Sequence, residues 1–228
     1  MISRFTQYLV EEQKEIFFAF GRMNPPTIGH EKLIEKLSKT AGGSAYRVYL
    51  SQSTDPKKNP LPYKEKIKTA RRMFPRHARG IILNNKLKTM LEVAVSLYNE
   101  GHQRITMVAG SDRVIEFKTL LEKYNGKKLR HGFYNFRSIN VVSAGQRDPD
   151  SEGVTGMSAS KMRESAGDND FRTFTQGLPK SFSNKNSKDL FNAVRKGMNL
   201  KPVKEWKHHI SLNTISENRE LYVAGVLY

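Results

Sequence analysis

The sequence predicts an α/β protein built on a doubly wound, five-stranded parallel sheet, followed by a C-terminal helical and β extension. Short apolar runs alternate with longer helical patterns between residues 16 and 142. The first run, Ile16–Phe20, is apolar at every position, which is typical of a strand buried on both faces of a parallel sheet. The segments between the runs are long enough for a helix each, and this alternation indicates right-handed βαβ units.

Five strands and four helices are expected in this part of the chain. The strands are predicted at Ile16–Phe20, Tyr46–Leu50, Gly80–Leu83, Ile105–Ala109 and Ser138–Val142. The helices are predicted at Gly29–Lys39, Tyr63–Met73, Lys88–Asn99 and Ser111–Tyr124, by helical spacing of their apolar residues. Because ligands bind beyond the carboxyl ends of the strands in such sheets, we expect a site in the loops that follow the first, second, fourth and fifth strands.

The pattern changes after residue 150. Short helices are predicted at Ser158–Ala166 and Asp170–Thr175, a polar connector at Ser181–Ser187, an amphipathic helix at Asp189–Met198 and a strand at Glu220–Tyr228. A segment as strongly β-forming as the last one needs a partner strand. The expected organisation is a leader or amphipathic segment at 1–14, a main domain at 15–178 and a C-terminal extension at 179–228.

The chain carries a large positive charge that is unevenly distributed. Its 228 residues include 39 Lys and Arg against 22 Asp and Glu, a formal net charge of +17. Residues 1–150 contribute +13 of this and residues 51–100 alone contribute +7. Such an excess favours an anionic substrate or partner. Two interpretations stay open at this point, a solvated lysine-rich surface and a funnel that attracts phosphates.

The composition also excludes several classes. The chain has no cysteine, so it can form no disulfide framework, zinc-thiolate site or thiol nucleophile, which suits a reducing compartment. It shows no signal-peptide pattern and no apolar run of membrane-spanning length. We therefore expect a cytoplasmic protein without a membrane partner.

The most informative segment follows the first strand. It reads Gly21-Arg22-Met23-Asn24-Pro25-Pro26-Thr27-Ile28-Gly29-His30. A helix that starts at this point directs free N–H groups and its positive dipole end toward the expected site, which favours an anion. Gly29 lets a phosphate approach the backbone, Thr27 offers a hydroxyl and His30 can donate to a phosphoryl oxygen. The alternative is a Pro-rich turn with a hydroxyl N-cap and a surface histidine.

Three further segments offer phosphate-binding groups. Met157-Ser158-Ala159-Ser160-Lys161-Met162-Arg163 places hydroxyls at a helix start, with Arg163 one turn beyond Ser160. Gly110-Ser111-Asp112 follows the fourth strand. A lysine-rich stretch, which includes Lys57, Lys58, Lys64 and Lys66, follows the second strand and forms the expected entrance for an anionic second substrate. The alternatives are a capped surface helix, a Ser/Asp helix cap and a solvated basic face.

Two of these segments resemble the signatures of the cytidylyltransferase-like nucleotidyltransferases, which include nicotinamide mononucleotide and phosphopantetheine adenylyltransferases. The family pattern is Gly-Arg-Phe-x-Pro-x-His-x-Gly-His, and the chain departs from it at Met23 and at Thr27, although threonine also occurs there in the phosphopantetheine branch. The second segment is similar to Ile-Ser-x-Thr-x-Ile-Arg, with Ser160 for Thr and Met162 for the aliphatic residue. Asn59-Pro60-Leu61-Pro62-Tyr63-Lys64-Glu65-Lys66 resembles a stretch of the nicotinamide branch, and Gly110-Ser111-Asp112 resembles a turn beside the nucleotide.

The resemblance implies a Rossmann-like fold and transfer of a nucleoside monophosphate from ATP, or next from CTP, to a phosphorylated small molecule, with release of pyrophosphate. It assigns catalysis to His30, Thr27 and Arg163, and nucleotide binding to Gly21, Arg22, Gly29, Gly110, Ser111, Asp112, Ser158, Ser160 and Lys161. Acceptor binding is expected of Lys57, Lys58, Lys64 and Lys66 from the charge of the lysine-rich stretch. No His, Asp and Glu spacing indicates a protein-built metal site, so Mg²⁺ is expected to arrive with the nucleotide.

A second function is compatible with the same residues: a nucleotide-binding or nucleic-acid-binding protein that keeps the fold but has reduced activity. The charge of +17 favours a nucleic acid or another polyanion as partner, and a homo-oligomer is also compatible. Residues 4–11, with Leu9-Val10-Glu11, resemble the short leaders of tailed-phage proteins and their Leu-x-Glu processing sites. That resemblance implies a phage-encoded protein in the host cytoplasm or the virion, and the alternative is an ordinary amphipathic cap.

Overall fold

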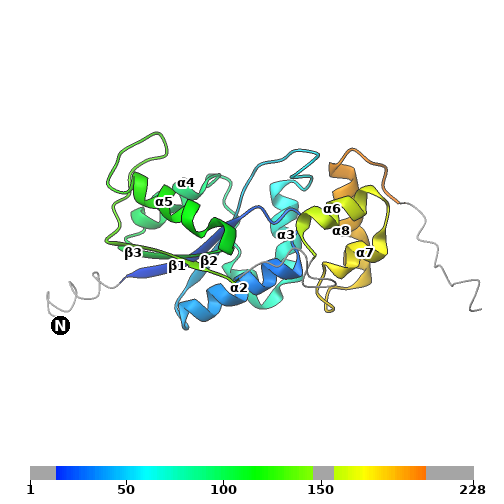
Figure 1. Cartoon of the computed structure of the whole chain (residues 1–228), viewed down its shortest axis with the longest axis horizontal. Helices are drawn as coiled ribbons and strands as arrows, with labels where there is room; N and C mark the ends of the chain where they lie inside the picture. Colours follow the sequence, from blue (N-terminus) through cyan, green and yellow to red (C-terminus); the bar gives the residue numbers. More distant parts are fainter. Residues whose placement is uncertain (1–13, 146–156, 204–228) are drawn as a thin grey trace, which may run out of the picture.

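The computed structural model describes residues 14–145 and 157–203. They contain a parallel sheet of four strands, β1 (Glu15–Gly21), β2 (Tyr46–Leu50), β3 (Arg104–Ala109) and β4 (Ser138–Ser143), in the order β2-β1-β3-β4 (Figure 1). The register pairs Ala19 with Val48 across β1 and β2, and Phe18 with Met107 across β1 and β3. The predicted α/β class with a parallel sheet is therefore confirmed.

Of the five predicted strands, the third, at Gly80–Leu83, is wrong. Within the described residues, Ile81 forms only an isolated parallel bridge, with Val48, after a 3₁₀ helix η1 (Pro75–Gly80). Side-chain donors bind the backbone carbonyl groups that a β-ladder would otherwise use. The Arg71 guanidinium donates two hydrogen bonds to the Ile81 carbonyl, at 2.7 and 3.1 Å, and the Tyr63 hydroxyl donates to that of Ile82 at 3.3 Å. The segment lies beside β2 without joining the sheet as a strand.

Helices cover both faces of the sheet. They are α2 (Ile28–Ala41), α3 (Tyr63–Met73), α4 (Met90–Asn99) and α5 (Val114–Tyr124), the last preceded by a short 3₁₀ helix η2 (Ser111–Arg113). Phe18 packs in one core cluster with residues of α4 and α5, whereas its neighbour Ala19 packs in the other with Ile34 and Leu37 of α2. Alternate residues of β1 thus serve opposite faces, as expected of a central parallel strand.

The strand order creates a topological switch point. The chain leaves β1 through α2 to reach β2 on one side, and β3 lies on the other side of β1. Ligands of doubly wound sheets bind where the order reverses, beyond the carboxyl ends of the strands. Here that place is bordered by the segments that follow Gly21 and Ala109.

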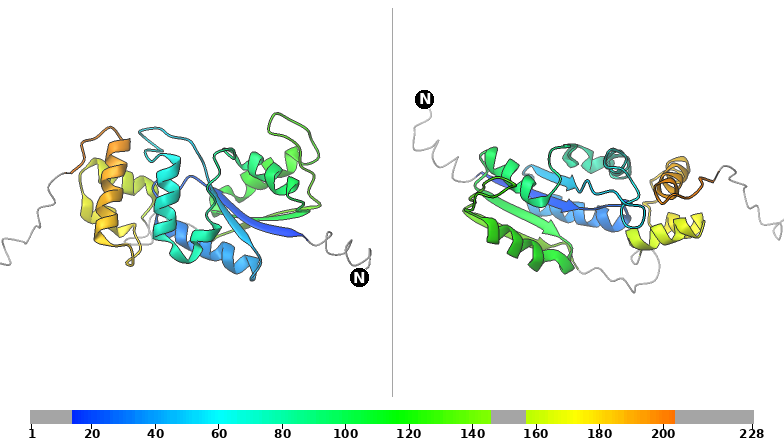
Figure 2. Two further views of the ribbon diagram at one scale, coloured as in Figure 1. Left: turned by 180° about the vertical axis from the view of Figure 1, so that it is seen from behind. Right: turned by 90° about the horizontal axis from the view of Figure 1, so that it is seen from above.

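Three helices follow residue 157: α6 (Ala159–Gly167), α7 (Phe171–Gln176) and α8 (Asn184–Gly197). They lie beyond the carboxyl ends of the strands and beside α3 (Figures 1 and 2), and their buried residues share a core cluster with α3. The predicted polar connector is wrong in its second half, because Ser183 caps α8 by accepting a hydrogen bond from the Asn186 N–H at 3.3 Å.

Other predictions fall outside the described residues. They are the leader over residues 1–13 and the terminal strand over residues 220–228. In the part of the chain that is described, no helix has both the length and the apolar character needed to cross a lipid bilayer.

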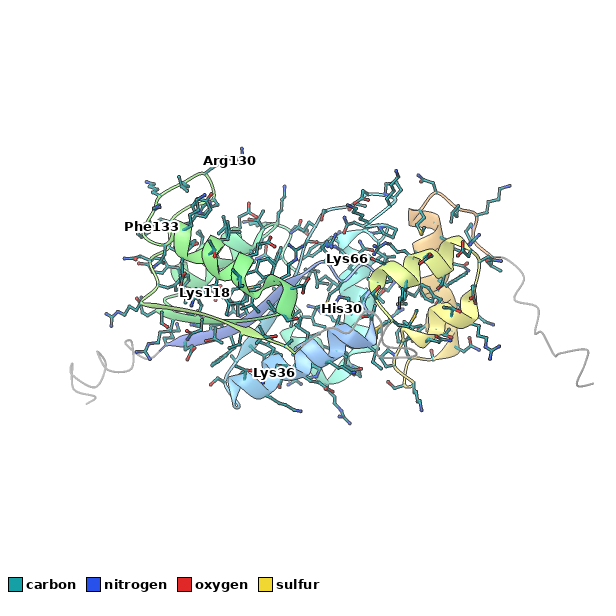
Figure 3. The ribbon with its side chains drawn as sticks, viewed as in Figure 1. His30, Lys36, Lys66, Lys118, Arg130 and Phe133 are labelled. Carbon is teal, nitrogen blue, oxygen red and sulfur yellow. The ribbon has the colours of Figure 1, made fainter. Side chains whose placement is uncertain are left out.

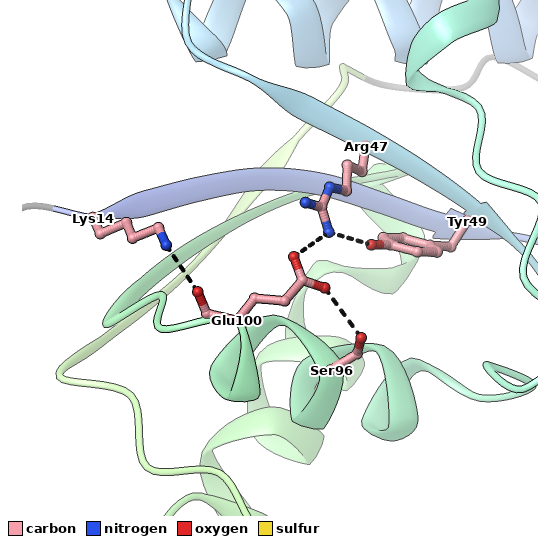
Figure 4. A network of polar contacts seen from close by, with 5 residues as sticks. All are labelled: Lys14, Arg47, Tyr49, Ser96 and Glu100. Atoms are coloured by element: carbon pink, nitrogen blue, oxygen red, sulfur yellow. Dashed lines mark hydrogen bonds and ion pairs between the residues drawn. The ribbon is translucent and has the colours of Figure 1, made fainter.

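A polar network joins α4 to the sheet at the end of the strands away from α6–α8 (Figure 4). The Glu100 carboxylate lies 2.7 Å from the Arg47 guanidinium and accepts a hydrogen bond from Ser96 at 3.2 Å. Its backbone carbonyl accepts a hydrogen bond from Lys14 at 2.8 Å. Because Arg47 and Glu100 are partly exposed, the ion pair contributes about 1 kcal/mol or less. Its role is to hold α4 against the starts of β1 and β2.

Candidate active site

The start of α2 fixes the orientation of His30. Thr27 is the buried N-cap residue, and its backbone N–H donates to Nδ1 of His30 at 3.0 Å. Its hydroxyl lies 2.9 Å from the same nitrogen. A backbone N–H can only donate, so Nδ1 is an acceptor and the proton of the neutral imidazole resides on Nε2. The threonine that departs from the family pattern thereby holds the histidine ring as an Nε2–H donor.

Fewer backbone N–H groups remain at this helix start than the sequence suggests. The Ile28 N–H donates to the Gly177 carbonyl at 2.9 Å, and the Thr27 N–H is used by His30. The Gly29 N–H has no acceptor within the described part of the chain. Gly29 is exposed, so its amide and the His30 ring are the candidate anion-binding groups of the first turn.

Asn24 organises the loop before α2, and sequence reasoning recognised it only as a turn residue. Its amide is buried and pairs twice with the backbone of Leu61, accepting from the Leu61 N–H at 2.9 Å and donating to the Leu61 carbonyl at 3.1 Å. An asparagine side chain presents one acceptor and one donor side by side, which suits such a pairing. The loop after β1 is thereby tied to the loop after β2.

Arg163 joins three segments of the site. Its guanidinium donates to the Asn24 carbonyl at 2.7 Å, to the Lys57 carbonyl at 3.1 Å and to the Ser160 hydroxyl at 3.0 Å. These three bonds use three of the five N–H groups of an arginine. Arg163 therefore clamps α6 to the loops after β1 and β2 and retains two donors.

Lys66 is a fully buried ammonium group. Its Nζ donates to the carbonyl of Ser51 at 2.5 Å, and the Ser51 N–H donates in turn to the Gly21 carbonyl at 2.9 Å. Lys66 thus reaches the carboxyl ends of both β1 and β2. Burial lowers the pKa of Lys66 to about 8, and the positive charge of Arg22 acts in the same direction.

Arg22, Lys66 and Arg163 form a cationic cluster. The exposed Arg22 guanidinium is close enough to lower the pKa of both Lys66 and Arg163, although burial is the larger cause for each. Asp55 opposes the shift at Arg163. Positive groups held together in this way favour a ligand with several negative charges. The cluster is the electrostatic centre of the candidate site.

The other predicted acceptor-binding lysines differ from Lys66. Lys57 and Lys58 are exposed on a turn whose backbone amides donate to the Asp55 carboxylate, at 3.1 and 2.6 Å. These hydrogen bonds lower the pKa of Asp55, and the bond from the Lys58 amide has the largest effect. Lys64 is exposed while Lys66 is buried, because residues two apart on a helix face different directions. Three of the four lysines thus lie on the surface around the cluster.

The remaining predicted residues lie at the same edge of the sheet or on α6. Gly110 follows β3 and precedes the 3₁₀ helix η2. Ser111 and Asp112 are exposed, with Asp112 4.0 Å from Arg113. Ser158 caps α6 by accepting from the Lys161 N–H at 3.2 Å. The side chains of Ser160 and Lys161 are exposed at the first turn of that helix.

Two other kinds of site are less well supported in the described residues. Over residues 14–145 and 157–203, no three His, Asp or Glu side chains gather as metal ligands would. A hollow of about 210 Å³ lies between α3 and α8 and is lined by residues that include Glu65, Lys68, Arg72 and Asp189. Its lining mixes both charges and contains neither His30 nor Arg163. The cationic cluster is therefore the better candidate for an anionic ligand.

Fold and site together define a parallel α/β protein with a cationic cluster at its topological switch point, which is a candidate site for a polyanion. A scan of protein-family models and a search of curated proteins find no match for the chain. Among solved structures, a similar one is described as "a Putative Nicotinate-nucleotide Adenylyltransferase from Vibrio parahaemolyticus". The alignment covers 79% of this chain and 100% of that chain, at 18% identity and a TM-score of 0.48. A likeness of that strength identifies no function, so the activity proposed below rests on the chain's own residues.

Proposed function

We propose that the protein is a nucleotidyltransferase that moves a nucleoside monophosphate from a nucleoside triphosphate to a phosphorylated small molecule. One observation carries this proposal: the loop whose Thr27 orients His30 also contributes to the cationic cluster of Arg22, Lys66 and Arg163. A donor histidine at a helix start and several cations at the switch point are the groups that a triphosphate and a second phosphate require.

The reaction needs no protein nucleophile. An oxygen of the acceptor phosphate attacks the α-phosphorus, the bond from that phosphorus to the bridging oxygen breaks, and pyrophosphate leaves with the electron pair. In this proposal His30 donates from Nε2 to the α- and β-phosphates, supported by Thr27 and the Gly29 amide. Arg163, Ser160 and Lys161 contact the β- and γ-phosphates. Such groups act by holding the reactants in line and by neutralising charge.

The second substrate is assigned to the other side of the cluster. The exposed Arg22 would bind the acceptor phosphate, and the buried charge of Lys66 adds to the positive potential beside it. The exposed Lys57, Lys58 and Lys64 attract the acceptor electrostatically. Mg²⁺ belongs to the substrate here, because the cation-rich site suits phosphates and would leave the ion to phosphate oxygens and water. ATP is the preferred donor, from the resemblance of residues 59–66 to the nicotinamide branch, and CTP is the next candidate.

The test is a matrix of ATP, CTP, GTP and UTP against phosphorylated acceptors, including nicotinamide mononucleotide and phosphopantetheine, with Mg²⁺ and release of pyrophosphate as the readout. His30→Ala should lower kcat/KM by about 10²- to 10³-fold with the best pair, the usual cost of losing one preorganised donor. The exposed Lys36 of α2, labelled with His30 in Figure 3, provides the control. Lys36→Ala should leave kcat/KM unchanged.

A second variant separates chemistry from folding. His30→Gln keeps an acceptor for the Thr27 N–H, since glutamine at this position can complete a capping box. It should restore the stability that His30→Ala loses, but only part of the activity. Equal kcat/KM for the wild type and both His30 variants would contradict the assigned role. If no nucleotide yields pyrophosphate while nucleotides still bind, the alternative of a nucleotide-binding protein with reduced activity is favoured.

A further inference from the structure

The loop between α5 and β4 is basic and lies far from the candidate active site. Residues 125–137 contain four Lys or Arg and no Asp or Glu: Lys127, Lys128, Arg130 and Arg137 are the basic residues. Because this loop leads into β4, it lies at the amino ends of the strands, whereas the cationic cluster lies at their carboxyl ends. Figure 1 places it at the opposite end of the molecule from α6–α8. We call residues 125–137 the basic loop.

The basic loop is held in shape by buried contacts at its base. The Asn125 side chain pairs with the backbone of Phe136, at 2.8 and 3.0 Å, and the buried Tyr134 hydroxyl donates to the Leu121 carbonyl at 2.8 Å. Gly132, with φ of 115°, packs so closely on α4 that a Cβ would lie 2.9 Å from Val95. These contacts order the backbone before any partner binds.

The tip of the basic loop presents its charges to solvent. Lys127, Lys128 and Arg130 are exposed, and none of the three forms an ion pair with another described residue. In Figure 3 the Arg130 side chain extends away from the body of the protein. Three such cations on an ordered loop are arranged to contact successive charges of a polyanion.

The same loop carries an exposed aromatic ring. Phe133 is 38% exposed and rests edge-on against Tyr98 of α4, with the ring centroids 5.8 Å apart. Leu129, 45% exposed, is the other large apolar side chain at the tip. An exposed ring and several cations on one surface are the combination on which unpaired bases stack while their phosphates are neutralised. A base within a duplex is already stacked and would not reach the ring.

We propose that the basic loop is a binding surface for single-stranded nucleic acid, with Lys127, Lys128 and Arg130 on the phosphates and Phe133 against a base. This function is separate from the proposed nucleotidyl transfer and does not depend on it. It would account for some of the positive charge that exceeds what a nucleotide-binding site requires.

The test measures the fluorescence anisotropy of labelled oligo(dT) and oligo(U), roughly 12 nucleotides long, and of a duplex of equal length, over a range of salt concentrations. The full chain should bind both single strands more tightly than the duplex. Lys127→Gln, Lys128→Gln and Arg130→Gln together should lower single-strand affinity at least about tenfold and reduce the salt slope by about 2. Phe133→Leu keeps an apolar contact with Tyr98 and should lower affinity roughly tenfold with an unchanged slope.

A matched control removes the same charge elsewhere. Lys32, Lys36 and Lys39 are exposed on α2, and changing all three to Gln should leave binding by the loop and the salt slope nearly intact. All these variants should release pyrophosphate at the wild-type rate if the enzyme is active, so the two proposals fail separately. Equal losses in the two triple variants, tighter binding of the duplex, or loop-dependent binding to vesicles of anionic lipid but not to oligonucleotides would overturn the proposal.

Discussion

Lys66 illustrates how a single residue can reveal a site. Its ammonium group is fully buried and donates to one backbone carbonyl, that of Ser51, although an ammonium carries three N–H donors. Burying a charge without an opposite charge is costly, and an unpaired lysine in the interior usually has a ligand or a lowered pKa. The pKa of Lys66 is lowered to about 8, and an anion at the cluster would reverse that shift.

The first prediction concerns the pH dependence of stability. Between about pH 8, the folded-state pKa of Lys66, and its ordinary value of 10.5, the unfolded chain binds more protons at this residue than the folded chain does. The free energy of unfolding should therefore rise with pH across this window, by up to about 3 kcal/mol. Chemical denaturation at successive pH values should show this rise in the wild type and not in Lys66→Met.

Lys68→Met is the control for that experiment, since Lys68 is exposed on the same helix. Its pH profile should run parallel to that of the wild type. If the profiles of wild type and Lys66→Met were parallel as well, Lys66 would not be a buried ammonium with a lowered pKa. Added pyrophosphate should flatten the wild-type rise, because a bound anion keeps Lys66 protonated.

At the scale of single elements, Arg163 links α6 to the loops of the candidate site. Arg163 connects it to the carbonyls of Asn24 and Lys57, which belong to two different loops. The resemblance of this motif implies that Arg163 lies near phosphates. The motif does not predict the hydrogen bonds to these two carbonyls. A residue with both tasks should affect folding and activity when it is changed.

The second prediction separates those two tasks. Arg163→Ala should lower the free energy of unfolding by about 2 kcal/mol, because charge-assisted hydrogen bonds to backbone carbonyls are lost. Its kcat/KM for pyrophosphate release should fall further than the fraction of unfolded protein explains. Arg172→Ala, at an exposed position of α7, should change stability by no more than about 0.5 kcal/mol. If kcat/KM of the folded Arg163→Ala variant equals that of the wild type, Arg163 only stabilises the structure.

The segment at residues 80–83 marks the limit of predicting elements from pattern. Its run of apolar residues has the composition of a buried strand, and Ile81 is buried beside β2. Whether it continues as a strand depends on hydrogen-bond partners from elsewhere, here Arg71 and Tyr63 of α3. A local pattern of apolar residues predicts burial well. It does not predict which side-chain donors compete with a neighbouring strand for the backbone carbonyls.

On the scale of the whole molecule, the C-terminal helices are packed tightly against the loop after β2. Gly197, the last residue of α8, approaches that loop so closely that a Cβ would lie 2.0 Å from the Pro60 carbonyl oxygen. Pro60 lies next to Leu61, which pairs with Asn24. The packing of α8 therefore bears on the position of the active-site loops.

The third prediction concerns this contact between α8 and the loop after β2. Gly197→Ala should lower the free energy of unfolding by about 2 kcal/mol, as overpacking forces the helix and the loop apart. Gly167→Ala is the matched control at the end of α6, where a Cβ would come no closer than 3.8 Å to Met198. Gly167→Ala should be neutral or stabilising by up to about 1 kcal/mol. Equal melting temperatures for both variants would show that the contact with Pro60 relaxes freely.

What the sequence determined by itself was local and periodic. The two buried faces of β1, the bounds of β2 and α3, and the position of His30 at the start of α2 all follow from residue patterns over short stretches. The reason is that backbone preferences and the alternation of apolar residues act between near neighbours in the chain. Charge counting likewise indicated an anionic partner before any contact was known.

Only the tertiary structure decided which groups meet. It selected Lys66 from the four candidate lysines, made Asn24 and Arg163 the connections between loops, and separated the basic loop from the cationic cluster by the length of the sheet. These relations join residues distant in sequence, and burial and hydrogen-bond geometry arise only when the segments pack. The charge surplus is one number in the sequence, but in the folded protein part of it lies in the cationic cluster and part on the basic loop, at opposite ends of the sheet.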